Sequence, residues 1–114
     1  MALSTALLAT GCVQFGSFVL KSGLQSPIYL DLRRLSGSAA AMRMAGAAYH
    51  RLLRNLRFER VAALPYAGLP LATAACLHGH YAMIYPRKEQ KEHGRRLAIE
   101  GPFERGDKIG RAHV

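Results

Sequence analysis

Apolar residues recur at helical spacing over the middle of the chain, and two short apolar runs follow them. The helical positions are Met42, Ala45, Tyr49, Leu52, Leu53 and Leu56. Ser38 stands just before this stretch, where its hydroxyl is suited to cap the first turn of a helix. The wholly apolar run 61–64 predicts a strand that is buried on both faces, as in a parallel sheet. The run 83–85 predicts the next strand of that sheet.

A second helix is expected between these two strands. Residues 69–77 are mostly apolar, and Pro70 falls in the first turn, where a missing N–H group is tolerated. The order strand, helix, strand is typical of an open, mostly parallel α/β sheet flanked by helices. The loops that follow 61–64 and 83–85 should then lie at one edge of the sheet. Ligands bind at that edge in proteins of this class.

A short helix and a hairpin are predicted before this unit. Residues 3–9 are expected to form a helix that ends at Gly11, in preference to a lipoprotein signal, because no Lys or Arg precedes the apolar part. Residues 18–20 and 28–30 are predicted as strands, and the turn residues between them place Lys21 at the hairpin tip. No run reaches the ~20 apolar residues of a membrane span, so no membrane partner is expected.

Charge adds a chemical expectation to this outline. Lys and Arg number 16 against 7 Asp and Glu, which gives a net charge of +9 and favours anionic partners. A dense set of cations follows the second strand: Arg87, Lys88, Lys91, His93, Arg95 and Arg96. Apolar residues 82–85 and 97–99 flank this set, which indicates a basic loop mounted on two strands and suited to a polyphosphate.

Two other interpretations of the basic segment remain open at this level. It could be a solvated charged face, or part of a small basic nucleic-acid-binding module, whose binding would depend strongly on salt. Few aromatic residues are interleaved with the cations, which disfavours a platform for stacking single-stranded bases.

The remaining candidate residues form no catalytic or metal motif. Cys12 and Cys76 occur without a C-x-x-C pattern and are expected to be free thiols in a reducing compartment such as the cytoplasm. His78 and His80 have no carboxylate or Cys at ligand spacing, so no metal site is expected there. His50 lies on the polar side of its helix and is expected to be solvated.

Three segments together resemble the orotate phosphoribosyltransferases. They are FVLKSGLQSPIY at 18–29, LPYAGLPLA at 64–72 and RKEQKEHG at 87–94. In order and spacing they are similar to that family's N-terminal signature, to the loop after its first core strand and to its catalytic loop. The resemblance runs from about Cys12 to Asp107, and the same domain also occurs fused to orotidylate decarboxylase in a bifunctional UMP synthase.

The resemblance implies a type I phosphoribosyltransferase fold with an N-terminal hairpin region. It implies transfer of ribose 5-phosphate from phosphoribosyl pyrophosphate to orotate in pyrimidine synthesis, giving orotidine 5′-monophosphate and pyrophosphate, with Mg²⁺ required. It also implies a homodimer in which loop 87–96 reaches the neighbouring subunit's site, and it gives no reason to expect nucleic acid as a partner.

The family's functional residues carry over onto positions of this sequence. Lys91 and His93 match the catalytic tip of the mobile loop. Tyr29 and Leu30 fall where the family stacks orotate, although half of the usual aromatic pair is replaced. The positions at which the family contacts phosphoribosyl pyrophosphate correspond to Lys21, Tyr66, Ala67, Arg87, Lys88, Lys91 and His93. Ala67 can offer only its backbone, and no metal ligand is carried over. Fixed cations of this kind stabilise the charge that grows on departing pyrophosphate.

One departure from the family concerns its second half. The paired acidic residues and the Thr-Ser-Gly turn that hold the ribose 5-phosphate are absent from this sequence. Residues 1–108 are therefore interpreted as an incomplete domain, and the 114-residue chain is expected to be inactive alone. A regulatory fragment that pairs with a full-length enzyme is a further possibility.

Residues 109–114 are predicted to be a non-native tail. Their sequence, IGRAHV, no longer matches the family, and a widely used sequencing-adaptor oligonucleotide, ATCGGAAGAGCACACGTC, encodes it in frame. We therefore expect resequencing of the locus to give different codons after Lys108, in a reading frame that continues. Genomic codons for 109–114 followed by a stop would contradict this prediction.

Overall fold

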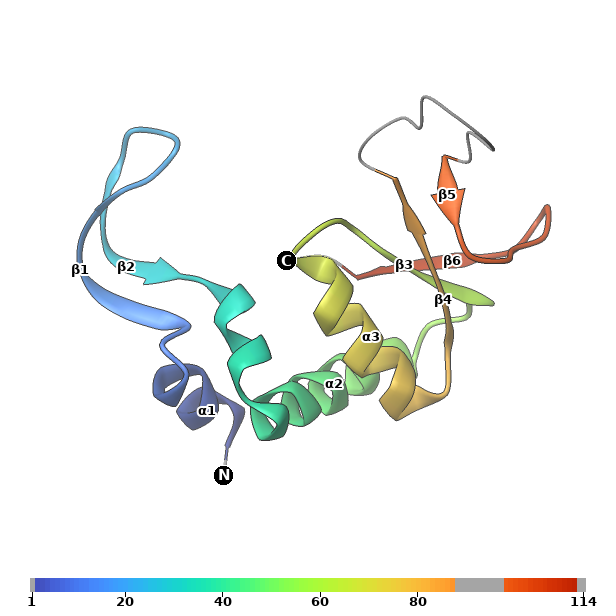
Figure 1. The fold of residues 1–114 in the computed structure, drawn as a ribbon, viewed down its shortest axis with the longest axis horizontal. Coiled ribbons are helices and arrows are strands. Elements are labelled where there is room, and N and C mark those ends of the chain that lie inside the picture. The colour runs from blue at the N-terminus through green and yellow to red at the C-terminus, as the bar shows by residue number, and fades with distance from the viewer. Residues whose placement is uncertain (1, 88–97, 113–114) are drawn as a thin grey trace. The chain divides into compact units, whose positions relative to one another are not determined.

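The computed structural model describes residues 2–87 and 98–112, with the side chains of 111 and 112 left out. The chain divides into two units, Met1–Met42 and Arg43–Val114 (Figure 1). None of the described helices is long and apolar enough to cross a membrane.

The first unit is built from a short helix and a two-stranded hairpin. Helix α1 spans Leu3–Ala9, strand β1 spans Val13–Val19, and strand β2 spans Gln25–Leu30. The two strands pair antiparallel. The predicted helix is therefore confirmed at its bounds, and the predicted hairpin is confirmed with longer strands. The strands are longer because ladder hydrogen bonds extend through Gly and Ser positions that carry no hydrophobic signal.

The hairpin turn and the end of α1 both depend on glycine. Gly23, with φ of +85°, donates its N–H to the carbonyl of Leu20 at 2.8 Å, which closes the turn that contains Lys21. Gly11, with φ of +77°, ends α1 in the left-handed region that favours glycine. Arg34 then donates from Nε to the carbonyl of Thr10 at 3.1 Å and ties this turn to the residues after the hairpin.

A 3-10 helix, η1, follows the hairpin over Leu32–Gly37 and was not predicted. It is too short to show a helical hydrophobic period, which is the reason that the sequence pattern misses it. Asp31 caps it by accepting the backbone N–H of Arg33 at 3.2 Å. The Arg33 side chain also donates to Asp31 at 2.7 Å, and this hydrogen bond lowers the pKa of the carboxyl group.

The second unit holds a four-stranded sheet with the order β5-β4-β3-β6 (Figure 1). Strand β3 pairs parallel with both β4 and β6, whereas β5 pairs antiparallel with β4. The strands are β3 at Arg60–Ala63, β4 at Ala82–Pro86, β5 at Ile99–Glu100 and β6 at Ile109–Ala112. The predicted open, mostly parallel sheet is confirmed. Of the expected strand at 97–99, Ile99 is in β5 and Leu97 lies outside the described residues.

Two helices complete this part of the fold. Helix α2 spans Ala39–Leu53, so the boundary between the two units falls within it, and helix α3 spans Gly68–Gly79 between β3 and β4. Ser38 accepts the backbone N–H of Ala41 on its hydroxyl at 3.2 Å, which confirms it as the N-cap of α2. The predicted unit of strand, helix and strand is therefore β3–α3–β4.

The core of the second unit lies between α3 and β3. Val61 and Ala63 have no exposed surface and pack with Ala72 and Ala75 of α3. The expectation that this strand is buried on both faces is wrong, because Ala62, which lies between them and faces the other side of the sheet, is partly exposed. Cys76 lies in the same cluster, where burial raises the pKa of its thiol. Both cysteines are free, as predicted, and both are buried.

The expectation of a solvated His50 is wrong. Its ring is half-buried, and Nδ1 forms a 2.8 Å hydrogen bond with the hydroxyl of Tyr81, just after α3. The His50 ring also lies 5.2 Å from that of His78, between centroids. The period of α2 places His50 on its polar side correctly, but that pattern does not reveal a partner from another element.

Residues 109–112, expected to belong to a non-native tail, form the edge strand β6. Ile109 pairs with Arg60 and Ala112 with Ala63. This pairing leaves the prediction about their origin untested, because a sheet ladder uses backbone groups that almost every residue type carries. The prediction therefore still depends on the gene sequence.

Helices α2 and α3 cross at a point where only glycine fits on α2. A Cβ atom added at Gly46 would lie 2.7 Å from the carbonyl oxygen of Ala74, which is a backbone atom. We expect Gly46→Ala to lower the free energy of unfolding by about 1–2 kcal/mol, because the clash outweighs the better helix propensity of alanine. Urea denaturation followed by circular dichroism would measure the change.

Gly37→Ala is the matched control, since no atom lies within 4 Å of the added Cβ. It should change stability by less than about 0.5 kcal/mol, as surface substitutions usually do. Equal stability of the two variants would contradict the close helix crossing.

Candidate functional site

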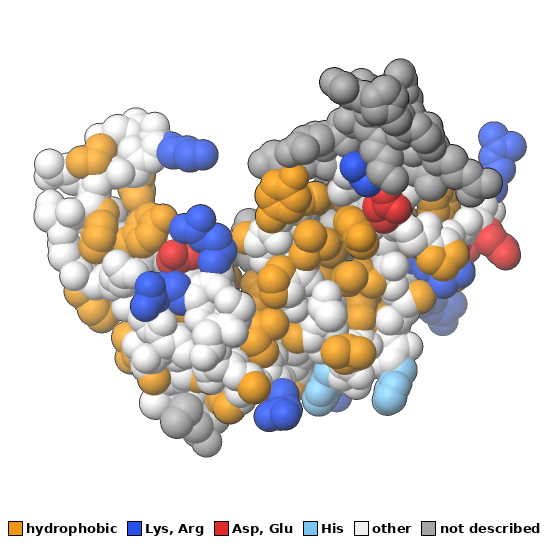
Figure 2. All heavy atoms as spheres, in the orientation of Figure 1, with side chains coloured by type: hydrophobic (Ala, Val, Ile, Leu, Met, Phe, Trp, Pro, Cys, Tyr) orange, Lys and Arg blue, Asp and Glu red, His pale blue; other side chains and the backbone are white. Residues whose placement is uncertain are grey.

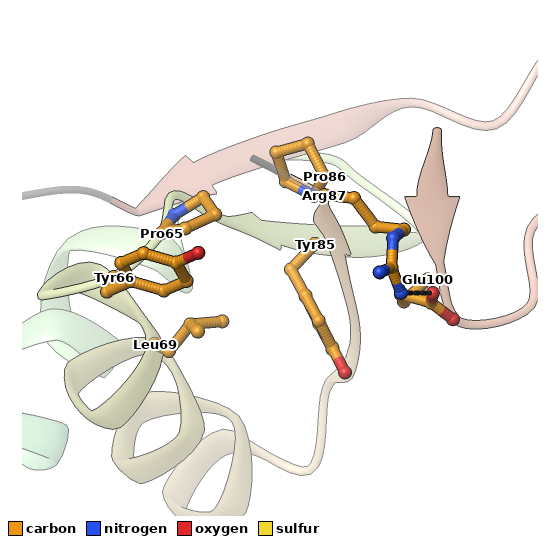
Figure 3. Close-up of a pocket in the computed structure, with 7 residues that line it drawn as sticks. All are labelled: Pro65, Tyr66, Leu69, Tyr85, Pro86, Arg87 and Glu100. Carbon is orange, nitrogen blue, oxygen red and sulfur yellow. Dashed lines mark hydrogen bonds and ion pairs between the residues drawn. The ribbon is translucent and has the colours of Figure 1, made fainter. Parts of the chain in front are cut away.

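A cavity of about 190 Å³ lies at the carboxyl ends of β3 and β4 (Figure 3). Parallel pairing of the two strands brings the loop after β3 and the end of β4 to the same edge of the sheet. The cavity is lined by Pro65, Tyr66, Leu69, Tyr85, Pro86, Arg87 and Glu100. The cavity therefore lies at the edge of the sheet where the order of elements leads us to expect a ligand site.

One side of the cavity is the loop that leads from β3 into α3. The peptide bond between Pro65 and Tyr66 is cis. Tyr66 lines the cavity and is exposed, with 59 % of its surface accessible. The carbonyl of Leu64 accepts the N–H of Gly68 at 3.1 Å, and the carbonyl of Tyr66 accepts that of Leu69 at 3.2 Å. These bonds hold the loop in a tight turn at the first residues of α3.

The amino end of α3 gives this side of the cavity a positive character. Ala67 is the N-cap residue and provides no side-chain cap, and no acidic residue occurs in the first turn. The first N–H groups of α3 are bonded to the carbonyls of the loop, so the positive character comes from the helix dipole, which adds partial positive charge at this end. An anion in the cavity would therefore meet a favourable field on the α3 side.

The opposite side of the cavity carries an ion pair. Nη1 of Arg87 lies 2.8 Å from Oε1 of Glu100, as drawn in Figure 3, with side chains that are 29 % and 28 % exposed. The backbone N–H of Arg87 also donates to the carbonyl of Ala98 at 2.8 Å. The chain therefore leaves β4 and returns into β5 at one place, beside the cavity.

The lining does not supply a set of Mg²⁺ ligands. Of the described residues that line this cavity, Glu100 is the one carboxylate, and it is bonded to Arg87. Among the described residues, no group of three or more His, Cys, Asp or Glu is arranged to hold a metal ion. Mg²⁺ is normally bound by one or two carboxylates together with substrate phosphates. These residues do not fit a metal held by the protein alone.

The candidate residues of the first unit lie on and beside its hairpin. Lys21 is exposed in the turn. The ring of Tyr29 packs against that of Phe18 with centroids 5.5 Å apart, and Leu30 is 64 % exposed. Figure 2 shows hydrophobic side chains at the surface of this hairpin. Phe15 and Val19 of β1 are each 71 % exposed.

Comparisons with known proteins return a consistent group of enzymes. The chain is 41 % identical over 98 residues to the bifunctional enzyme PyrF/PyrE of Nostoc, covering 86 % of this chain and 20 % of that protein. It is 41 % identical over 100 residues to the orotate phosphoribosyltransferase of Caenorhabditis elegans, covering 86 % of this chain and 44 % of that protein.

Comparison with solved structures finds the same group of enzymes. The UMP synthase of Leishmania donovani superposes with a TM-score of 0.84 at 45 % identity, covering 96 % of this chain and 23 % of that protein. The chain is a homologue of orotate phosphoribosyltransferases. The fold expected of a type I phosphoribosyltransferase is thereby confirmed. No family model matches the chain.

The chain spans only part of these orotate phosphoribosyltransferase homologues. It covers 20 % of the bifunctional Nostoc enzyme and 44 % of the Caenorhabditis enzyme. The similarity therefore concerns the elements described above.

The structure brings together some of the residues that the resemblance to orotate phosphoribosyltransferases indicated. Tyr66 and Arg87 line the cavity, and Ala67 lies beside it as the N-cap of α3. Lys88, Lys91 and His93 fall outside the described residues. Lys21, Tyr29 and Leu30 belong to the first unit, which is described by itself.

Sequence reasoning did not name five of the lining residues as site residues: Pro65, Leu69, Tyr85, Pro86 and Glu100. Tyr85 was assigned only to a strand. Leu69 was assigned to a helix and to the segment 64–72, without a role of its own. Glu100 directly follows the apolar residues 97–99, so the expectation that these residues form a strand could have placed Glu100 opposite the end of β4. Its opposite charge to Arg87 was the remaining signal.

Proposed function

We propose that this chain supplies the pyrophosphate-binding side of an orotate phosphoribosyltransferase site. The reaction would transfer ribose 5-phosphate from phosphoribosyl pyrophosphate to orotate in the synthesis of pyrimidine nucleotides. The observation that carries the proposal is the cavity between the β3–α3 loop and Arg87, in a chain whose relatives are named for this reaction. The protein that catalyses this transfer would be longer than the present chain, since the relatives named for the reaction are longer.

In this proposal the cavity holds the pyrophosphate group of the donor. The positive end of the α3 dipole and Arg87 lie on two sides of this cavity, and Tyr66 is part of its lining. When the bond between ribose and pyrophosphate breaks, negative charge grows on the leaving oxygens. Donors that are already in place stabilise this charge more in the transition state than in the ground state.

The remaining assignments extend the proposal beyond the cavity. Lys88, Lys91 and His93 would contact phosphoribosyl pyrophosphate from loop 87–96, with Lys91 and His93 as catalytic residues. Lys21 would contact the substrates near the reacting centre, and Tyr29 and Leu30 would pack against orotate. Exclusion of water by such a loop would prevent hydrolysis of the reactive ribosyl group.

Partners and location follow from the same relationship. We propose a homodimer in which loop 87–96 reaches the site of the neighbouring subunit. Mg²⁺ would arrive with the pyrophosphate oxygens and neutralise part of their charge, since the described residues offer no ligand set of their own. The two free thiols fit a reducing compartment such as the cytoplasm.

The binding half of the proposal predicts an effect of Arg87 on pyrophosphate affinity. Calorimetric titration of the chain with pyrophosphate and Mg²⁺ should show binding that Arg87→Ala weakens about tenfold, the scale of one charge-assisted hydrogen bond. Arg105→Ala is the matched control, because it removes the same charge from an exposed position that does not line the cavity. Equal affinities of the two variants would contradict the site.

The catalytic half predicts that these 114 residues form no orotidylate from orotate and phosphoribosyl pyrophosphate. The sequence has no turn of the kind that holds the ribose 5-phosphate in the family, so the donor would be held at one end only. Chromatography of the reaction mixture would detect the product, with an established orotate phosphoribosyltransferase as positive control. Product formed by the purified chain would disprove the predicted inactivity.

The nucleic-acid alternative makes a different prediction for the same sample. Salt-dependent binding to a generic RNA or DNA, unaffected by phosphoribosyl pyrophosphate, would favour it over the enzyme. Release of the nucleic acid by phosphoribosyl pyrophosphate would instead place both anions on one surface.

A further inference from the structure

The ion pair between Arg87 and Glu100 lies at the cavity, unlike the other ion pairs found among the described residues. Arg33 pairs with Asp31 in the first unit, and Arg60 pairs with Asp107 away from the cavity lining. A carboxylate at an anion site is costly, because its charge repels the ligand. Its presence in the lining therefore calls for a physical explanation.

We propose that Glu100 is a positioning residue that fixes the guanidinium of Arg87 for a polyphosphate ligand. This inference rests on the proposed function, because it takes the ligand to be the pyrophosphate group of the donor. Glu100 would not contact the reacting atoms. It would act by holding the Arg87 side chain at the cavity before the ligand arrives.

The backbone around Glu100 is suited to hold that carboxylate in one place. Strand β5 pairs with β4 so that Glu100 is opposite Tyr85 and Ile99 is opposite Pro86. The next residue, Gly101, has φ of +98°, and a Cβ atom there would lie 3.0 Å from the carbonyl oxygen of Met83. The chain therefore turns sharply against β4 directly after Glu100, which restricts where its side chain can reach.

Arginine is a residue that gains from such a support. Its side chain has many rotamers, and immobilising it on binding opposes affinity. A guanidinium carries five N–H donors in a rigid fork, so it can bond a carboxylate along one edge and a phosphate along another. The pair is also partly withdrawn from water, with 29 % and 28 % of the side chains exposed, so solvent screens it less than a fully exposed pair.

Two effects of Glu100 on anion binding oppose each other. Its charge lowers the affinity by repulsion, whereas its hydrogen bond raises the affinity by preordering Arg87. Glu100→Gln removes the charge and retains an oxygen that accepts from the guanidinium, and Glu100→Ala removes both. Comparison of the two variants therefore separates the effects.

The experiment is a calorimetric titration of the complete 114-residue chain with pyrophosphate in the presence of Mg²⁺. We expect Glu100→Ala to raise the dissociation constant about fivefold, the scale set by ordering one rotamer-rich side chain. Glu100→Gln should bind as well as the wild type or more tightly. Glu104→Ala is the control for net charge, since it removes an exposed acid that does not line the cavity.

A double-mutant cycle with Arg87→Ala distinguishes positioning from a general effect on folding. If Glu100 acts through Arg87, then Glu100→Ala should no longer weaken binding in the Arg87→Ala chain, and relief of the repulsion should leave the dissociation constant unchanged or lower. A fivefold loss in both backgrounds would overturn the proposal, because it would show that Glu100 acts on the fold. An unchanged or lower dissociation constant for Glu100→Ala would also overturn it, because repulsion would then be its main effect.

The same titrations separate this inference from the proposed function. Failure of the wild-type chain to bind pyrophosphate, or indifference of binding to Arg87→Ala, would overturn the proposed function and this inference with it. Binding that depends on Arg87 and not on Glu100 would overturn the positioning role alone.

Discussion

Parallel pairing of β3 and β4 is the constraint on which the rest of the site depends. Arg60, Val61 and Ala62 lie opposite Ala82, Met83 and Ile84. Parallel neighbours cannot be joined by a tight turn, so the chain must cross over through α3 and return to the same end of the sheet. Small residues on α3 allow a close approach to the buried face of β3. The β3–α3 loop and the end of β4 consequently meet at one cavity.

The few acidic residues of this basic chain mainly organise local structure. Asp31 caps η1, and Asp107 accepts from Arg60 and from the backbone of Glu104. Glu59 accepts the backbone N–H of Lys108. These carboxylates therefore form hydrogen bonds at turns and strand ends. The excess of Lys and Arg gives the protein a positive long-range electrostatic field.

Sequence pattern predicted the elements better than it predicted contacts between them. The period of α2, its Ser38 cap and the apolar run of β3 are local signals, and each led to the correct element. His50 and Glu100 were misjudged or missed because their partners, Tyr81 and Arg87, come from other elements. The resemblance of the motifs indicated Tyr66 and Arg87, and both line the cavity. A family motif reflects the tertiary arrangement of its residues, whereas hydrophobic periodicity reflects only the local element.

The start of α3 shows a conflict between local stability and anion binding. An acidic residue in the first turn typically stabilises a helix by about 0.3–1 kcal/mol, and a capping side chain by about 1 kcal/mol. Helix α3 has neither, because Ala67 is its N-cap and its first turn lacks an acid. Either device would place an oxygen where the helix meets the cavity. The first turn of α3 therefore lacks two features that would stabilise the helix, and the positive end of the helix stays suited to an external anion.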